Sequence, residues 1–260
     1  YRNKLVQLVH DPFPHLGEQT YRRKINRYFS HHFTKCFVML NQSLRKAYIE
    51  RYKLDPKRVH VSRLGVYECL WNVSPIERPH TKRTIIFFGR ISPYKGIEYL
   101  LKAMNIIHDE EPDIQLVIAG GGKLYFDKAL YEGKQYIKII NRFLSMEELY
   151  GYLLSSDLAV CPYVDATQSG VIMTAYATSL PVVATRVGGL PEMVEDGITG
   201  LLVNPKDEKD LANAILKIVS SDSILNQYKE NVKQAVLNGA FSWDKIADQY
   251  LEIFIDFKHQ

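Results

Sequence analysis

Short apolar runs alternate with helical patterns along this chain, and that alternation limits the folds it can adopt. The runs lie at 84–88, 114–119, 136–140, 158–161, 181–184 and 201–203. Runs of this length, separated by loops and amphipathic stretches, are typical of strands in a parallel sheet that is covered on both faces. The sequence therefore predicts an α/β fold, with a mostly parallel sheet wrapped by helices.

The chain is long enough for two domains, and a stretch containing Pro79 and several charges predicts a linker at 76–83. Before it, residues 1–75 hold expected strands at 4–9, 35–40 and 59–62 and expected helices at 21–35 and 43–52. Residues 84–240 are expected to form a complete domain. A last helix within 241–260 is expected to pack back toward the N-terminal portion.

Composition excludes several classes of protein. Hydrophobic residues make up 46% and charged residues 24%, which is ordinary for a folded domain and argues against disorder. No apolar stretch approaches the roughly 18 residues that a membrane-spanning helix needs. Cys36, Cys69 and Cys161 are odd in number and scattered. That spacing argues against a disulfide framework or structural zinc, and it favours the reducing cytoplasm.

Charge is distributed unevenly along the chain. Residues 1–83 hold 17 Lys and Arg against 6 Asp and Glu, whereas residues 84–260 hold 16 against 23. The basic front portion predicts an anionic membrane surface or an anionic acceptor as a partner, although a solvated basic face without a partner is also consistent with it. The aromatic residues of helix 21–35 favour the membrane surface. We expect no nucleic-acid partner.

The segment 89–96 is the most informative part of the sequence for function. It follows the apolar run 84–88 and precedes a helical pattern formed by Ile97, Leu100, Leu101, Met104 and Ile107. Open α/β sheets bind ligands in loops at the carboxyl ends of their strands. Arg90 and Lys95 in such a loop suit a diphosphate, because Arg offers a planar fork and Lys a compact charge.

The same segment resembles the donor-site signature of a known family. The pattern GR-I-x-x-x-KG-I-x-x-LL-x-A is similar to that of retaining family-4 (group 1) glycosyltransferases, which have the two-domain GT-B fold. The resemblance covers nearly the whole chain and is strongest from 84 to 222. It implies a complete C-terminal Rossmann-like domain and a partial N-terminal one, with about the first half of the acceptor domain absent from this chain.

The resemblance also implies an activity. Such enzymes transfer a sugar from a nucleotide-diphosphate sugar to a glycan or lipid-linked acceptor, with retention of anomeric configuration. We expect no cofactor and no metal, because no His, Asp and Glu set has convincing metal-ligand spacing. The expected setting is bacterial surface-polysaccharide assembly, in the cytoplasm or on the inner face of the cell membrane.

Site residues follow from the resemblance by position. Arg90 and Lys95 match the pair that grips the donor diphosphate, and His10 matches a histidine that faces the reacting sugar, although His15, His31 and His32 lie nearby. His10, Arg90 and Lys95 are the expected catalytic residues. The donor-binding set comprises Gly89, Arg90, Lys95, Gly120, Gly122, Phe143, Gln168, Ser169, Gly170, Val171 and Thr174. Within it, Gly120 and Gly122 are expected to be mainly structural.

The sequence departs from the family pattern at two positions. Most relatives have two glutamates separated by seven residues, and Ala166 and Thr174 stand in their places. Thr174 carries no charge and offers a short hydroxyl, so ribose binding should be weaker or differently arranged. Altered donor contacts, an unusual donor and lost activity all remain open. We favour the first, because the segment Thr167 to Val171 still suits a phosphate.

Two rival functions remain open. One is a catalytically impaired sugar-nucleotide-binding protein, which Ala166 and Thr174 motivate. The other is a GT-B sugar-nucleotide epimerase. An NAD-dependent oxidoreductase is disfavoured, because Tyr125 stands where the dinucleotide fingerprint needs its third glycine.

Overall fold

The structure, a computed structural model, describes residues 5–13 and 21–259 and divides them into two compact units. The larger unit is Val66–Gly239. The smaller unit contains the described residues of Tyr1–Gly65 and Ala240–Gln260. Both hold a parallel sheet, which confirms the predicted α/β fold class. The linker and domain limits expected from the sequence stay predictions.

The larger unit is built on a six-stranded sheet in the order β6-β5-β4-β7-β8-β9. Every neighbouring pair is parallel. The strands are β4 (Thr84–Phe88), β5 (Gln115–Ala119), β6 (Ile137–Ile140), β7 (Leu158–Cys161), β8 (Val182–Thr185) and β9 (Gly200–Val203). The four central strands are buried almost throughout, which explains their continuous apolar sequences.

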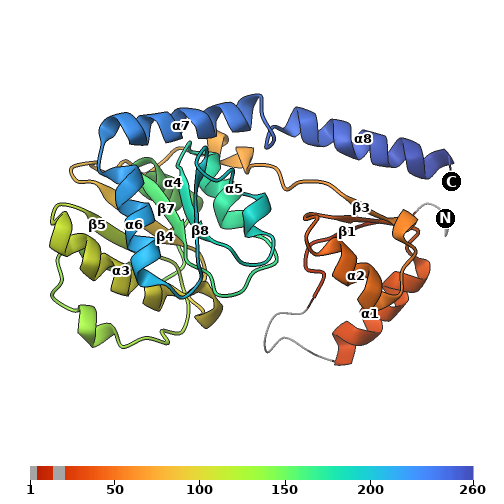
Figure 1. Cartoon of the computed structure of the whole chain (residues 1–260), viewed down its shortest axis with the longest axis horizontal. Coiled ribbons are helices and arrows are strands. Elements are labelled where there is room, and N and C mark those ends of the chain that lie inside the picture. Colours follow the sequence, from red (N-terminus) through yellow and green to blue (C-terminus); the bar gives the residue numbers. More distant parts are fainter. Residues whose placement is uncertain (1–4, 14–20, 260) are drawn as a thin grey trace. The chain divides into compact units, whose positions relative to one another are not determined.

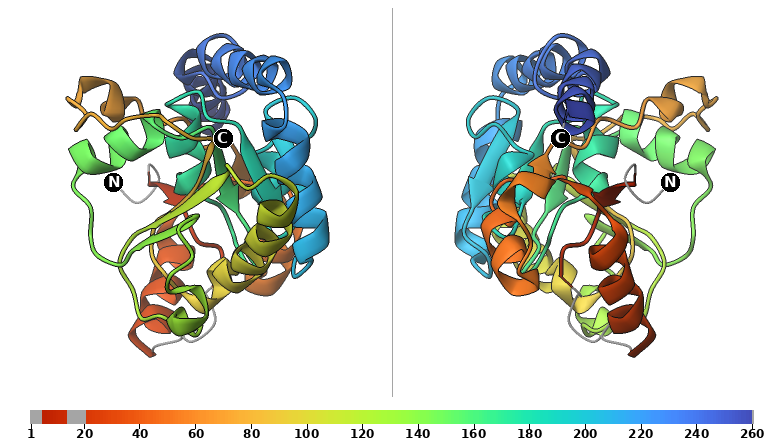
Figure 2. Two further views of the ribbon diagram at one scale, coloured as in Figure 1. Left: turned by 90° about the vertical axis from the view of Figure 1, so that its left-hand side faces the viewer. Right: turned by 90° about the vertical axis from the view of Figure 1, so that its right-hand side faces the viewer.

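Helices cover both faces of this sheet (Figures 1 and 2). The crossover from β4 to β5 runs toward one sheet edge, whereas those from β6 to β7 and from β7 to β8 run toward the other. Because such crossovers are right-handed, α3 lies on one face and α4 and α5 on the opposite face. The helices are α3 (Ile97–Glu110), α4 (Met146–Leu154), α5 (Gly170–Tyr176), α6 (Glu208–Val219) and α7 (Asp222–Leu237).

Local sequence explains where these helices begin. A capping box begins α4, where the Ser145 side chain accepts from the Glu148 amide and the Glu148 carboxylate accepts from the Ser145 amide. Asp207 caps α6 by accepting from the Lys209 and Asp210 amides. The predicted apolar face of α3 is buried, and α3 packs against α6. Short 3-10 turns complete the unit: η3 (Glu68–Asn72), η4 (Pro93–Lys95), η5 (Lys128–Tyr131) and η6 (Leu190–Glu192).

The sequence analysis assigned no element to residues 222–240, and this omission was wrong because α7 fills most of that range. Its buried residues Leu225, Tyr228, Val232 and Val236 recur at helical spacing. The pattern was therefore present in the sequence. The preceding helix, α6, ends at Val219, so two successive helices follow β9.

The smaller unit contains a three-stranded parallel sheet in the order β1-β2-β3. One face of this sheet packs Val9, Phe37 and Met39 against Tyr48 of α2. On the other face, Cys36 and Val38 pack against Ile253, so a helix distant in sequence completes the unit. Its elements are β1 (Val6–Val9), α1 (Tyr21–Phe33), β2 (Cys36–Met39), α2 (Arg45–Tyr52), η2 (Pro56–Arg58), β3 (Val59–Val61) and α8 (Trp243–His259).

A buried carboxylate, Asp157, joins three segments of the larger unit at the start of β7. Its side chain is 1% exposed and accepts from the Thr84 amide at 2.9 Å, from His80 at 2.8 Å and from Lys229 at 3.1 Å. Arg83 lies 3.3 Å away. Burial alone would raise the pKa of the Asp157 carboxyl, but these donors outweigh it and hold the pKa below its ordinary value.

Replacing Asp157 by Asn should destabilise the larger unit by about 2 kcal/mol, because it removes the charged acceptor of the buried Thr84 amide and the counter-charge of the partly exposed Arg83 and Lys229. Because the folded pKa is lowered, the contribution is complete above the ordinary value of 3.8 and is lost as pH falls through the folded pKa. Urea unfolding at pH 7 and pH 3 measures both effects. Asp113→Asn is the matched control, since Asp113 is 95% exposed and pairs with Lys82 at the surface. Equal stability of the two variants at pH 7 would contradict the prediction.

Candidate functional site

The predicted site residues of the larger unit lie in or directly after loops at the carboxyl ends of β4, β5, β6 and β7. These four strands are neighbours in the sheet. Because the strands are parallel, the loops meet at one edge, which is the usual ligand-binding edge of such sheets. The structure therefore brings the predicted donor-binding residues to one place, while their contacts with a ligand stay predictions.

Backbone hydrogen bonds join the first three loops. The Ile91 amide donates to the Gly121 carbonyl at 3.0 Å, and Ile91 forms a parallel bridge with Gly122. The Gly122 amide donates to Asn141 Oδ1 at 3.1 Å, which connects the loop after β6. Three loops with few regular elements of their own are thus held as one surface.

Gly120 and Gly122 are required by this close approach. A Cβ on Gly120 would lie 2.0 Å from the Gly89 carbonyl oxygen, and its φ of +150° is poorly accessible to other residues. A Cβ on Gly122 would lie 2.2 Å from the Ile91 carbonyl oxygen. Both glycines therefore have the structural role that the sequence analysis expected, whether or not they also contact a ligand.

Arg90 and Lys95 differ sharply in exposure, although the sequence pattern predicts the same role for both. Arg90 is exposed, whereas Lys95 is 8% exposed at the end of η4. The Lys95 ammonium lies 3.6 Å from the centre of the Tyr163 ring and 5.1 Å from that of Tyr94. Among the described residues, no carboxylate lies within ion-pair distance of Lys95. The site therefore holds one exposed cation, Arg90, and one buried cation, Lys95, that contacts an aromatic ring.

The environment of Lys95 weakens its hold on a proton. Burial is the main cause and lowers the pKa of its ammonium from 10.5 to about 8. The positive charge of Arg90 lowers the pKa further, while a thiolate at Cys161 would act in the opposite direction. A desolvated cation without a counter-ion is poised to attract an anion strongly.

The start of α5 supplies further polar groups to the same edge. Ser169 is 3% exposed at the N-cap position, and Gln168 before it is half-buried. The first-turn amides, including those of Gly170 and Val171, have no partner within the helix by geometry alone. The Thr174 hydroxyl donates to the Gly170 carbonyl at 2.8 Å. Toward a ligand, that hydroxyl can therefore only accept a hydrogen bond.

Phe143 lies on a short turn after β6 and is 89% exposed. Arg142 holds the turn in place through two hydrogen bonds to Glu148, at 2.8 and 2.5 Å. Bonding to Arg142 lowers the pKa of the Glu148 carboxyl to about 2. The turn is thus anchored to the capping box of α4, and its backbone lies beside Gly121.

Three tyrosines at this edge were missed by sequence reasoning. The Tyr125 hydroxyl accepts from the Ile97 amide at 2.8 Å, directly after Lys95 and Gly96. The Tyr67 hydroxyl lies close enough to Gly170 that a Cβ there would be 2.7 Å away. Tyr163 contacts Lys95 as described. No motif or spacing marks these residues, because each acts through its place in the fold.

His10 lies in the smaller unit, directly after β1. Its side chain is 62% exposed, and Nδ1 lies 3.5 Å from Asp11 Oδ2. Its predicted role opposite the reacting sugar stays a prediction. Of the other histidines considered, His15 falls outside the described residues. His31 is engaged within the unit, since its Nε2 lies 2.7 Å from the Tyr48 hydroxyl.

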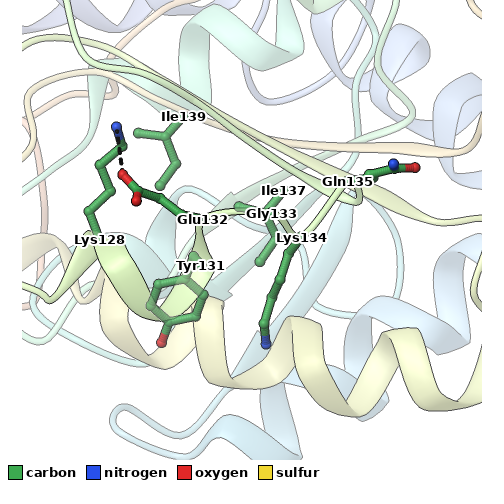
Figure 3. Close-up of a pocket in the computed structure, with 8 residues that line it drawn as sticks. All are labelled: Lys128, Tyr131, Glu132, Gly133, Lys134, Gln135, Ile137 and Ile139. Carbon is green, nitrogen blue, oxygen red and sulfur yellow. Dashed lines mark ion pairs between the residues drawn. The ribbon is translucent and has the colours of Figure 1, made fainter.

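A separate pocket lies beside the start of β6, where η5 replaces a crossover helix (Figure 3). Its two cations are already engaged, since Lys128 pairs with Glu132 at 3.5 Å and Lys134 donates to Asn105 at 2.7 Å. It includes none of the predicted site residues. Across residues 5–13 and 21–259, no three His, Cys, Asp or Glu side chains lie close enough together to bind a metal ion. None of the helices in these residues is long and apolar enough to cross a membrane.

Comparison with known proteins identifies a family. The family described as "Glycosyl transferases group 1" matches residues 82–221, which is more than half of the chain. An uncharacterized glycosyltransferase of Methanocaldococcus jannaschii is 28% identical over 237 residues, covering 85% of this chain and 60% of the relative. An alpha-maltose-1-phosphate synthase of Mycolicibacterium smegmatis is 28% identical over 243 residues, covering 84% and 62%. The chain thus spans about three fifths of the length of these relatives.

Solved structures agree on the fold. The Anabaena protein HepE, in complex with UDP, matches with a TM-score of 0.75 and 20% identity, covering 96% of this chain and 71% of that protein. The likeness confirms the predicted GT-B fold class.

Replacing Lys95 by Met should stabilise the ligand-free protein. A pKa lowered from 10.5 to about 8 means that the charged form costs the folded state up to about 3 kcal/mol. Because the unfolded state binds more protons between these values, the cost is complete below pH 8 and disappears as pH approaches 10.5. We expect Lys95→Met to gain 1 to 3 kcal/mol, roughly, at pH 7 and about a quarter of that gain at pH 10, by urea unfolding.

Arg90→Met provides the control, because Arg90 is exposed in the same loop. Its stability should stay within about 0.5 kcal/mol of the unmodified protein at both pH values. A Lys95→Met variant that is less stable than the unmodified protein at pH 7 would show that Lys95 is not a buried, unpaired charge.

Proposed function

Because the chain belongs to the group 1 glycosyl transferases, we propose that the protein of which it is part transfers a sugar from a nucleotide-diphosphate sugar to a glycan or lipid-linked acceptor. One observation carries this proposal above the others: the buried Lys95 ammonium, without a counter-ion, lies in the same loop as the exposed Arg90. A buried cation without a counter-ion destabilises the folded protein, and a bound anionic ligand would offset that cost. The UDP complex of HepE, similar in fold, supports a nucleoside diphosphate as that ligand.

In the proposed reaction, the diphosphate occupies the edge formed by Arg90, Lys95 and the start of α5. The bond between the anomeric carbon and the diphosphate oxygen breaks while the acceptor oxygen bonds to the same face of that carbon. Because the new bond forms on the face that the diphosphate leaves, the configuration is retained. The acceptor proton passes to the leaving phosphate, so no carboxylate base is needed. Arg90, Lys95 and the α5 amides stabilise the charge that develops on the leaving group.

We propose that these two cations neutralise the diphosphate without a metal ion or cofactor. Arg90 can grip two phosphate oxygens at once with its planar fork. Lys95 acts as a point charge in a dry setting, where an interaction with an anion is stronger than in water. His10 would contact the reacting sugar, as its match to the family's histidine implies.

The acceptor proposal rests on the smaller unit. Helix α1 exposes Tyr28, Phe29 and Phe33, with exposed fractions of 69%, 52% and 37%. The same helix carries Arg22, Arg23, Lys24 and Arg27 in its sequence. Aromatic and basic residues on one helix suit an anionic membrane surface, so we propose a lipid-linked acceptor at the cytoplasmic face of the cell membrane. Bacterial surface-polysaccharide assembly is the proposed setting.

A thermal-shift screen against UDP, GDP, ADP, CMP and their sugar conjugates tests donor binding. A ligand at 100 times its Kd should add about 2.7 kcal/mol to stability. Arg90→Ala and Lys95→Ala should each weaken binding of the preferred diphosphate by about a hundredfold, since each removes a charged contact. Lys102→Ala, on an exposed position of α3, should bind as the unmodified protein does. Unchanged binding in both site variants would refute the diphosphate site.

Turnover distinguishes the rivals in the full-length protein. Transfer to an acceptor, or release of the nucleoside diphosphate, supports the transferase. Binding without turnover favours the impaired binding protein, whereas conversion of the donor sugar without any acceptor favours the epimerase.

Affinity for the diphosphate should depend on pH through Lys95. In the free protein its pKa is about 8, and a bound anion must raise it. Below pH 8 Lys95 is charged with or without ligand, so it adds no pH dependence. Above pH 8 binding must take up a proton, and Kd should rise by up to about tenfold per pH unit. Calorimetry between pH 7.5 and 9.5 measures this, and a constant Kd over that range would contradict it.

A further inference from the structure

Tyr163 lies between two parts of the candidate site. One is the Lys95 ammonium, and the other is the start of α5, whose first backbone amides have no partner within the helix. Tyr163 follows β7, it is 0% exposed, and its ring centre is 3.6 Å from the Lys95 ammonium. Its hydroxyl lies 3.2 Å from the hydroxyl of Ser169, the N-cap residue of α5. One side chain therefore touches both Lys95 and the start of α5.

The Tyr163 ring holds the Lys95 ammonium in a defined position, where none of the described carboxylates is within ion-pair distance. An aromatic face attracts a cation, and the attraction is strongest when both groups are removed from water, as here. Tyr94 is the other ring nearby, but its centre is 5.1 Å from the ammonium. The two rings meet edge to face at 77°, which fixes the orientation of Tyr163.

The backbone of Tyr163 is fixed as firmly as its ring. Its carbonyl accepts from the Thr185 hydroxyl at 2.6 Å, which ties it to β8. The Val164 amide donates to the Tyr94 carbonyl at 2.8 Å, which ties the same loop to η4. Ser169 is held in turn, since its amide donates to Met193 Sδ at 3.3 Å. The distance between the ammonium and the α5 start is thus set by a rigid residue.

We propose that Tyr163 is a positioning residue that fixes the Lys95 ammonium and the start of α5 at the separation a nucleoside diphosphate requires. This inference rests on the proposed function, because the diphosphate is the ligand that both groups would contact. Tyr163 itself is fully buried and acts through Lys95 and Ser169. Preorganised donors of this kind favour binding because they need no rearrangement when the ligand arrives.

The test uses two substitutions that separate the ring from the hydroxyl, in the full-length protein. Tyr163→Phe keeps the ring and loses the contact with Ser169, and Tyr163→Leu loses both. Affinity is measured by calorimetry for whichever of UDP, GDP and ADP binds the unmodified protein most tightly. We expect Kd to rise by about fivefold in the Phe variant, because it loses one hydrogen bond. We expect Kd to rise by about fiftyfold in the Leu variant, because it loses that hydrogen bond and the cation–π contact with Lys95.

Tyr176→Phe is the matched control for stability. Tyr176 is also fully buried in the larger unit, and its hydroxyl bonds to Thr199 at 2.7 Å, far from Lys95 in the chain. Tyr163→Phe and Tyr176→Phe should therefore lose similar thermal stability, while only Tyr163→Phe weakens nucleotide binding. Equal nucleotide affinity in these two variants would overturn the proposal, and this pair decides the matter if Tyr163→Leu does not fold.

A double-substitution cycle distinguishes positioning from general loss of structure. If the Tyr163 ring acts through Lys95, Tyr163→Leu should raise Kd by no more than about fivefold in a Lys95→Met background, because only the contact with Ser169 remains to be lost there, as measured by ligand-observed NMR. The same large loss in both backgrounds would overturn the proposal while leaving the proposed function intact. An unmodified protein that binds none of the three nucleotides would overturn both.

Discussion

Parallel pairing of β4, β5, β6 and β7 is the constraint on which the site depends. In a parallel sheet every strand ends at the same edge, so loops far apart in sequence become neighbours without any contact designed between them. The chain then adds specific contacts where the loops meet. Gly120 and Gly122 allow backbone to approach backbone, and the Ile91 and Gly122 amides close the gaps. The cations are thus presented on a surface that the fold has already made rigid.

In the proposed site, stability and ligand binding oppose each other at Lys95. A lysine that is 8% exposed, with an aromatic ring in place of a carboxylate, keeps its full charge available to a ligand at the expense of the folded state. A carboxylate partner would have stabilised the protein, but it would also have competed with a diphosphate. At the opposite end of the sheet, Asp157 shows the alternative arrangement: a buried charge surrounded by His80, Arg83 and Lys229. One buried charge is satisfied within the protein and the other is not.

Sequence patterns predicted the elements of the larger unit well because most of its strands are buried on both faces and its helices have one apolar face. The strand 84–88 was found where it was expected. Helix α7 was missed although its periodicity was present. At the site, sequence placed Arg90 and Lys95 in one loop but gave no sign that one is exposed and the other buried. Tyr163, Tyr125 and Tyr67 were missed for the same reason, since burial and cross-loop contacts depend on tertiary packing.

The departures at Ala166 and Thr174 are better explained by packing than by decay of the site. Ala166 is 5% exposed, and a Cβ on Gly188 would lie only 1.5 Å from its carbonyl oxygen, so the loop is tightly packed there. Thr174 is 8% exposed and bonds within its own helix. A glutamate at either position would place a carboxylate in buried surroundings, where it would need hydrogen-bond partners of its own. The packing at both positions therefore favours altered donor contacts over lost activity as the reason for the missing glutamates.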